Sequence, residues 1–169
     1  SPAFIKGIRE SLPEAEVTLA CACPPEAGLA ALRAALGSPF DISGAAFAQG
    51  RALIRVEGMA GSVSYRMGEL RKRLAGDWQA ATGEESARLW AGVRDVVPFA
   101  GRPGAVWRVV MKQTEAAGFA AAMGGEAVFD WGGGLVWLLT EGGQGDRLRA
   151  TLGRNGHATL IRPDRGDSP

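Results

Sequence analysis

Apolar residues in the first half of the chain change their spacing several times, between every second residue and every third or fourth residue. Alternation predicts strands that bury one face, and the longer spacing predicts amphipathic helices. Pro25 suits the first turn of the first helix, and Gly37 suits its C-terminal end. The order strand, helix, strand, strand, helix, strand is the split βαβ or ferredoxin-like unit. The elements are expected at Val17 to Ala22, Pro25 to Leu36, Phe40 to Phe47, Ala52 to Glu57, Ser62 to Ala75 and Trp78 to Ala81.

The second half of the chain repeats this order after a connecting helix. Thr82 and Glu85 match a capping box at the start of that helix, and its apolar stripe includes Leu89 and Val93. The fold class predicted is therefore α+β: a duplicated ferredoxin-like arrangement, βαββαβ twice, with two antiparallel sheets and helices on one face of each. The later elements are expected at Ala105 to Met111, Thr114 to Met123, Ala127 to Trp131, Leu135 to Thr140, Asp146 to Gly153 and His157 to Ile161.

Length and local composition set the expected boundaries. A chain of 169 residues forms one domain or two very small ones. Residues 1–15 lack an initiator methionine and are expected to be a linker cut from a longer protein. One domain is expected over 16–162, with halves at 16–82 and 104–162 joined by a helix over 84–97, followed by a disordered tail over 163–169.

A glycine-rich segment between the two strands of the last hairpin is the most distinctive stretch of the chain. It reads Asp130-Trp131-Gly132-Gly133-Gly134-Leu135-Val136-Trp137. Adjacent glycines supply the positive φ that short hairpin turns need. One interpretation is a structural hairpin with two core tryptophans. The other is a ribbon without Cβ atoms, which lets a ligand or a partner chain approach the backbone closely.

The charge and hydropathy of the chain exclude several classes of protein. A formal net charge of +1 gives no basic field that would attract nucleic acid. There is no run of about 20 apolar residues, so no membrane-spanning helix is predicted. The first residues, Ser1 to Arg9, lack the apolar core of a signal peptide.

Two cysteines, Cys21 and Cys23, lie two residues apart on a predicted strand and would point to the same face. A structural metal site needs more ligands, and the chain has a single histidine, so no metal site is predicted. Free thiols of this kind are typical of a protein in a reducing cytoplasm.

Sequence motifs for known catalytic or nucleotide sites are missing. No nucleophile elbow, P-loop or dinucleotide-binding glycine motif is found. The glycine cluster from Gly142 to Gly145 precedes a predicted helix and could hold an anion at the helix N-terminus. Because Asp146 at the cap position opposes an anion, an ordinary loop is the preferred interpretation.

Strand alternation places a set of polar residues on the sheet face opposite the helices. Each is out of phase with the apolar residues of its own strand. A single helix layer leaves that face to meet solvent, a substrate, a flavin or a partner. Two copies of the isolated domain are expected to pair through this face in concentrated solution. The candidate residues are Arg55, Arg108, Asp130, His157 and Thr159, with the neighbouring Trp131.

Several motifs, taken together and in order, resemble one family. This combination is similar to the C-terminal half of the FAD-binding subunit of bacterial glycolate oxidase, over roughly residues 14 to 162. That family belongs to the FAD-linked oxidases related to vanillyl-alcohol oxidase. The motifs are Asp130-Trp131-Gly132-Gly133-Gly134-Leu135-Val136-Trp137, Gly156-His157-Ala158-Thr159-Leu160, Gly83-Glu84-Glu85-Ser86-Ala87-Arg88-Leu89-Trp90, Val106-Trp107-Arg108-Val109 and Ser43-Gly44-Ala45-Ala46.

The resemblance implies a fold and a reaction. Members of the family carry an N-terminal FAD-binding domain and a C-terminal α+β domain of duplicated ferredoxin-like type, which covers the flavin and the substrate side. FAD is therefore expected in the parent protein, held mostly by the missing N-terminal domain, with none expected in this chain. The reaction implied is hydride transfer from a small 2-hydroxy acid such as glycolate to FAD.

The resemblance also implies residue roles and partners. Arg108 would clamp the substrate carboxylate, and His157 would be the base that accepts the hydroxyl proton. The Gly-Glu-His-Gly motif of the related catalytic-type subunit is missing, so a non-catalytic assembly module is the second hypothesis. The expected partners are the domain's own FAD-binding domain and the other oxidase subunits, in the cytoplasm or peripherally at the inner membrane through the complex.

Overall fold

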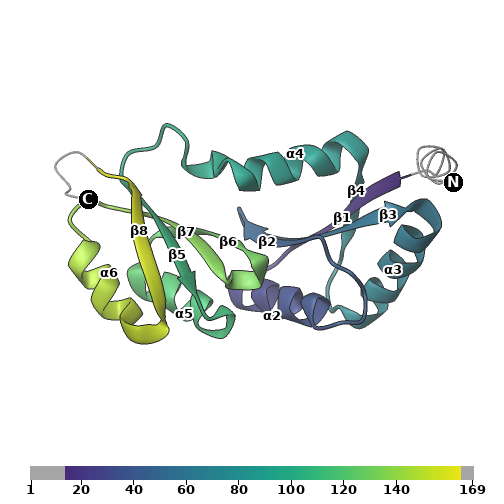
Figure 1. Cartoon of the computed structure of the whole chain (residues 1–169), viewed down its shortest axis with the longest axis horizontal. Helices are drawn as coiled ribbons and strands as arrows, with labels where there is room; N and C mark the ends of the chain where they lie inside the picture. Colours follow the sequence, from purple (N-terminus) through teal and green to yellow (C-terminus); the bar gives the residue numbers. More distant parts are fainter. Residues whose placement is uncertain (1–13, 165–169) are drawn as a thin grey trace, which may run out of the picture.

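The computed structural model describes residues 14–164 (Figure 1). Residues 1–13 of the expected linker and 165–169 of the expected tail lie outside the described residues. The linker is expected to run to residue 15, but β1 already begins at Glu14. The strands are β1 (Glu14–Ala22), β2 (Gly44–Ala48), β3 (Arg51–Met59), β4 (Gln79–Thr82), β5 (Ala105–Met111), β6 (Glu126–Asp130), β7 (Leu135–Thr140) and β8 (Gly156–Arg162). The α-helices are α2 (Pro25–Leu36), α3 (Ala60–Arg73), α4 (Gly83–Arg94), α5 (Gln113–Met123) and α6 (Gly145–Leu152), with 3₁₀ turns at Val97–Phe99, Trp131–Gly133 and Gly153–Asn155.

All eight strands belong to one sheet, in the order β4-β1-β3-β2-β6-β7-β5-β8, and every neighbouring pair is antiparallel. The α+β class is confirmed, but the expectation of two separate sheets is wrong. β2 and β6 join the halves through one bridge, in which Phe47 is paired with Phe129. The two rings meet edge to face with centroids 6.1 Å apart, so aromatic packing closes this seam.

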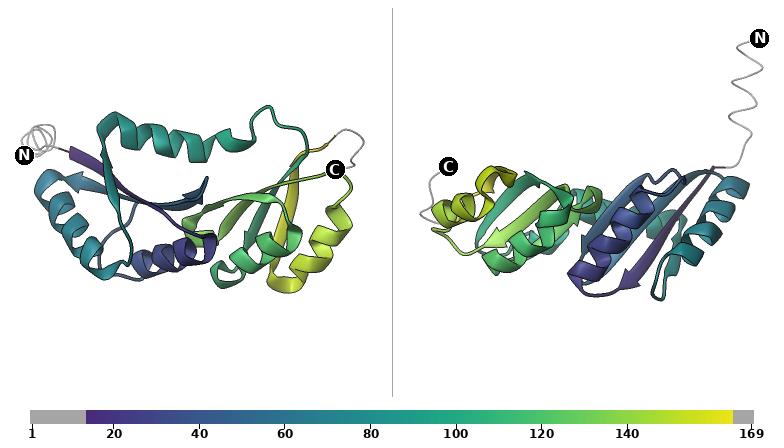
Figure 2. Two further views of the ribbon diagram at one scale, coloured as in Figure 1. Left: turned by 180° about the vertical axis from the view of Figure 1, so that it is seen from behind. Right: turned by 90° about the horizontal axis from the view of Figure 1, so that it is seen from below.

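Four helices cover one face of the sheet and enclose the main core. Figure 2 shows α2 and α3 beside one half of the sheet and α5 and α6 beside the other. The side chains of Leu19, Ile54 and Leu138 are fully buried beneath them, because the alternating apolar positions of the strands meet the apolar stripes of the helices. This layer agrees with the spacing of apolar residues in the sequence.

The fifth helix, α4, crosses the opposite face of the sheet (Figure 1). The expectation that this face carries no helix is therefore wrong. Val93 of α4 and Phe99 of the following 3₁₀ turn pack on Leu53 and Val106 of the sheet. α4 has this position because the connection between the halves must cross the seam, and its apolar stripe then buries itself on the sheet it crosses. Among the described residues, no helix is both long enough and apolar enough to cross a membrane.

Several local predictions differ from the structure. The connecting helix expected over 84–97 ends at Arg94, and a 3₁₀ turn follows at Val97–Phe99. The side chain of Thr82 makes no capping hydrogen bond to α4, because Thr82 is the last residue of β4 and pairs with Val17. The predicted strand from Phe40 begins only at Gly44. Phe40 lies in a loop, and its ring packs against the core. The spacing of apolar residues cannot distinguish such a loop residue from a buried strand residue.

Candidate functional site: a cleft beneath helix α4

The 3₁₀ turn after β6 places the indole of Trp131 on the sheet face that α4 crosses. Trp131, Gly132 and Gly133 all have positive φ, at 49°, 66° and 103°. Two hydrogen bonds fix the turn: the Trp131 N–H donates to Asp130 Oδ1 at 2.8 Å, and Gln113 Nε2 donates to the Trp131 carbonyl at 3.1 Å. Trp131 is 54% exposed, so the interpretation of two core tryptophans is wrong for this residue.

A cleft of about 600 Å³ lies between α4 and the sheet. Arg55, Arg108, Asp130 and Trp131, all predicted from strand alternation and resemblance, line it together. They come from β3, β5, β6 and the 3₁₀ turn after β6, so the seam between the two halves brings them to one place. The other lining residues are Glu16, Ser43, Gly44, Ala87, Trp90, Ala91, Val93, Arg94, Leu135 and Trp137.

His157 and Thr159 do not line this cleft. Thr159 pairs across the strands with Arg108, and His157 pairs with Val110, so both share the open face with the cleft because paired residues point the same way. Both side chains are exposed on the edge strand β8. The structure thus groups Arg108 with the tryptophans of the cleft rather than with the histidine.

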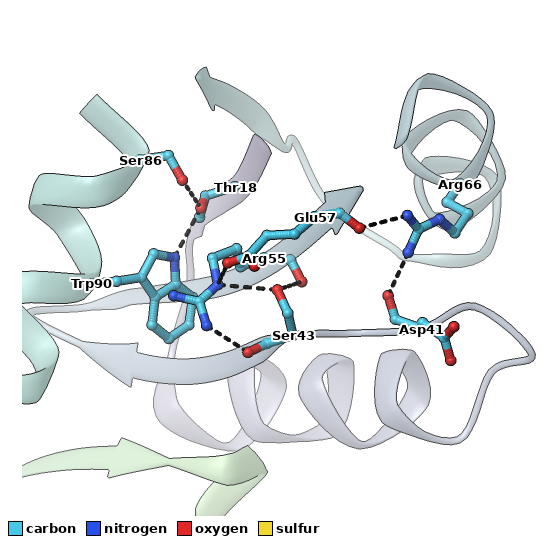
Figure 3. A network of polar contacts seen from close by, with 8 residues as sticks. All are labelled: Thr18, Asp41, Ser43, Arg55, Glu57, Arg66, Ser86 and Trp90. Atoms are coloured by element: carbon cyan, nitrogen blue, oxygen red, sulfur yellow. Dashed lines mark hydrogen bonds and ion pairs between the residues drawn. The ribbon is translucent and has the colours of Figure 1, made fainter. Parts of the chain in front are cut away.

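Arg55 is held by several partners (Figure 3). Its Nε atom lies 3.0 Å from Ser43 Oγ and 2.8 Å from Glu57 Oε1, and its Nη2 donates to the Ser43 carbonyl at 2.6 Å. Its guanidinium carbon also lies 4.7 Å from the ring centroid of Trp90, a distance at which a cation and an aromatic face attract each other. Arg55 is therefore tied to the sheet through Ser43 and Glu57 and touches α4 through the Trp90 ring.

Trp90 anchors α4 through a buried polar network that the sequence did not reveal. Its Nε1 donates to Thr18 Oγ1 at 2.9 Å, and Thr18 Oγ1 lies 2.6 Å from Ser86 Oγ (Figure 3). Thr18 and Ser86 are both fully buried, and buried hydroxyls are retained where they pair. A Cβ atom on Gly44 would lie 2.8 Å from the Trp90 ring, so glycine at that position leaves room for the indole.

Arg108 differs from Arg55 because its guanidinium is free. Its side chain is exposed at the cleft, and within residues 14–164 it has no hydrogen-bond or ion-pair partner. Trp137 lies directly across from it on β7. A free guanidinium beside indoles can bind a carboxylate with two hydrogen bonds while the rings exclude water from the pair.

Asp130 is the acidic group of the cleft whose ionisation is most affected by its surroundings. Burial raises its pKa above the usual range, while the hydrogen bond from the Trp131 N–H and the charge of Arg55 act in the opposite direction. Because the folded pKa is raised, Asp130 stabilises the fold below the ordinary carboxyl pKa of about 3.9, and this contribution is lost as the pH rises through the folded pKa.

The Asp130→Asn variant is expected to gain stability over the parent chain as the pH rises from acid to neutral, because the amide cannot ionise but still accepts the bond from Trp131. Urea unfolding of both proteins at several pH values measures the difference in free energy. The pKa assignment fails if that difference is constant with pH or shrinks toward neutrality.

The glycine-rich loop before α6 is a poor place for the phosphates of a dinucleotide such as FAD. The glycine-rich loop before α6 leads to an N-cap at Gln144 whose side chain makes no capping bond, and Asp146 occupies the first turn. A carboxylate at that place repels a phosphate. Within residues 14–164 there is also no group of three or more metal-ligating side chains.

Comparison with known proteins gives one relative of note. The chain is 30% identical over 122 residues to glycolate oxidase subunit GlcE of Escherichia coli (strain K12), a match that covers 72% of this chain and 31% of the relative. The chain therefore spans less than a third of that protein's length. The match supports a distant relationship to glycolate oxidase subunits and agrees with the resemblance seen in the sequence.

The remaining comparisons add little. No family model matches the chain. A crystal structure of a microcompartment protein from Desulfitobacterium hafniense covers 89% of this chain and 94% of that chain, with 15% identity and a TM-score of 0.34. That score is too low for the likeness to support an argument about fold or function.

Proposed function

We propose that this chain is the C-terminal domain of a flavin-dependent 2-hydroxy-acid oxidase subunit, and that the cleft beneath α4 faces the substrate. The observation that carries the proposal is the free guanidinium of Arg108 in a cleft walled by Trp90, Trp131 and Trp137. The similarity to a glycolate oxidase subunit supports the same class of substrate. Arg108 is the proposed carboxylate clamp.

FAD in this proposal belongs to another part of the parent protein. The loop before α6 offers no cradle for its phosphates. The contribution of this chain is to orient the acid and to limit the access of water. His157, outside the cleft on β8, is the proposed base for a substrate that extends from Arg108 toward that strand.

We also propose that the two halves are a duplicated ferredoxin-like unit. Numbered within each half, the strands of both halves follow the order 4-1-3-2, read from the outer edge of the sheet to the seam. Each half also has one helix after its first strand and one after its third strand. Such a match of order and connection is expected after duplication of one βαββαβ unit.

The function is tested with Arg108→Ala in the complete oxidase complex. Loss of a charge-assisted contact of about 1.5–3 kcal/mol corresponds to a fall of roughly 10- to 150-fold in kcat/KM for the 2-hydroxy acid. Arg108→Lys is expected to recover only part of the activity, because lysine cannot form the two-pronged contact. The matched control is Arg154→Ala, since Arg154 is exposed and does not line the cleft.

The second candidate function is a docking module for another oxidase subunit. It is favoured by exposed apolar side chains, since Val110 is 45%, Ile161 is 50% and Trp131 is 54% exposed. GlcE is by name one subunit of glycolate oxidase, so further subunits are plausible partners. Failed assembly of Arg108→Ala or His157→Ala would support this function, whereas lost turnover in an intact complex supports the first.

A further inference from the structure

A second cleft lies on the face of the sheet opposite α4, apart from the cleft proposed to face the substrate. It measures about 590 Å³ and is formed by α2, the end of β1 and the segment before β4. Cys21 and Cys23 both line it and both are free thiols. The Cys23 N–H donates to the Gly50 carbonyl at 3.1 Å, which continues the extended pairing beyond the end of β1. Residues two apart on an extended segment point the same way, so the two sulfurs lie side by side.

Glycines keep the space around both sulfurs open. A Cβ atom on Gly76 would lie 3.1 Å from Cys21 Sγ, and a Cβ atom on Gly28 would lie 3.3 Å from Cys23 Sγ. Alanines supply much of the remaining lining, and Arg51 and Asp77 are its charged residues. The thiols therefore lie at the border between the core, to which Cys21 belongs, and a small, mainly apolar space.

The two thiols are held only weakly by the protein itself. Cys21 donates to the Ala22 carbonyl with a sulfur–oxygen distance of 3.7 Å, and Cys23 donates to the Cys21 carbonyl at 3.5 Å. Neither thiol has a strong partner that a ligand would have to displace.

We propose that Cys21 and Cys23 form a two-coordinate site for a soft monovalent cation, with Cu(I) as the matching ion. Thiolates select soft ions, and Cu(I) accepts two of them. Zinc requires about four ligands, and no third metal-ligating side chain joins the pair among residues 14–164. On binding, each thiol releases its proton and each sulfur forms one bond to the metal, which stays Cu(I), so no oxidant or reductant is needed.

The test is an anaerobic titration of the full chain with Cu(I) against a coloured Cu(I) chelator. One equivalent is expected to bind, with two sulfur neighbours in the X-ray absorption spectrum. Removing one sulfur removes the chelate effect, so Cys23→Ser is expected to weaken binding by roughly 100-fold or more. Circular dichroism checks that this half-buried position tolerates serine, and Cys21→Ser, at the buried position, is the second variant.

Three results would overturn the site: no Cu(I) retained against the chelator, a Cys23→Ser chain that binds as tightly as the parent, or Zn(II) bound with equal affinity. The absorption spectrum of the unaltered chain decides the matter even where a variant fails to fold. Ser38→Ala, which removes a hydroxyl outside the cleft, is the control and is expected to leave Cu(I) binding unchanged.

Discussion

Replacing Phe99 with alanine is expected to lower the free energy of unfolding by about 3–5 kcal/mol, the usual cost of truncating a buried phenylalanine. Phe99 is 1% exposed and fills the space between the sheet and the chain that follows α4. Its neighbours belong to strands of both halves, such as Leu53 of β3 and Leu139 of β7, and they cannot all move inward to close the cavity.

Val97 is the matched control for Phe99, because it lies in the same 3₁₀ turn but is 56% exposed. Val97→Ala is expected to change stability by no more than about 0.5 kcal/mol. Denaturant unfolding of the two variants beside the parent gives both numbers. Equal losses for the two variants would mean that the layer formed by α4 and this turn does not pack on the sheet as described.

A substitution at Gly133 is expected to have the second largest effect. The φ of Gly133 is 103°, a backbone conformation that costs a residue with a Cβ atom on the order of 1–3 kcal/mol. A Cβ atom there would also approach Ala116 Cβ to 3.3 Å and the Gln113 carbonyl to 3.4 Å. Gly133→Ala should therefore lower the free energy of unfolding by an amount near the top of that range.

Gly68→Ala is the control for the glycine substitution. Gly68 lies in the interior of α3 with no atom near its missing Cβ, so alanine is expected to stabilise the chain by about 0.8–1 kcal/mol through helix propensity. Opposite signs for the two Gly→Ala changes, measured by thermal and urea unfolding, are the expected result. A neutral Gly133→Ala would show that the Trp131–Gly133 turn adopts another backbone in solution.

The order of elements was predictable because it depends on local spacing of apolar residues, such as Val63, Met67 and Leu70 on the buried side of α3. The single sheet was not predictable in the same way. It depends on the pairing of β2 with β6, whose one bridge joins Phe47 to Phe129, residues more than 80 positions apart. Neither phenylalanine differs locally from any other strand residue. Non-local pairing is specified by packing rather than by local pattern.

Part of the candidate site was predictable for a similar reason. Alternation placed Arg55, Arg108 and Asp130 on one face, since the side-chain period of a strand is fixed at two. The role of α4 in the site was not predicted. Trp90 lies beside the apolar stripe of that helix, so the spacing of apolar residues does not mark it as a site residue. Thr18 was the available signal: a hydroxyl at the centre of an apolar strand needs a buried partner, which Trp90 and Ser86 supply.

Under the duplication proposed above, the seam between β2 and β6 corresponds to the interface of a symmetric dimer whose two subunits are joined in one polypeptide. The second strand of one half meets the second strand of the other in antiparallel register, as in an isologous interface where one surface binds its own copy. Each half alone would expose that strand edge, an open template for pairing with other chains. A cut within α4 would therefore release two fragments with aggregation-prone edges, so the boundary between the halves is not a place where this chain can be divided.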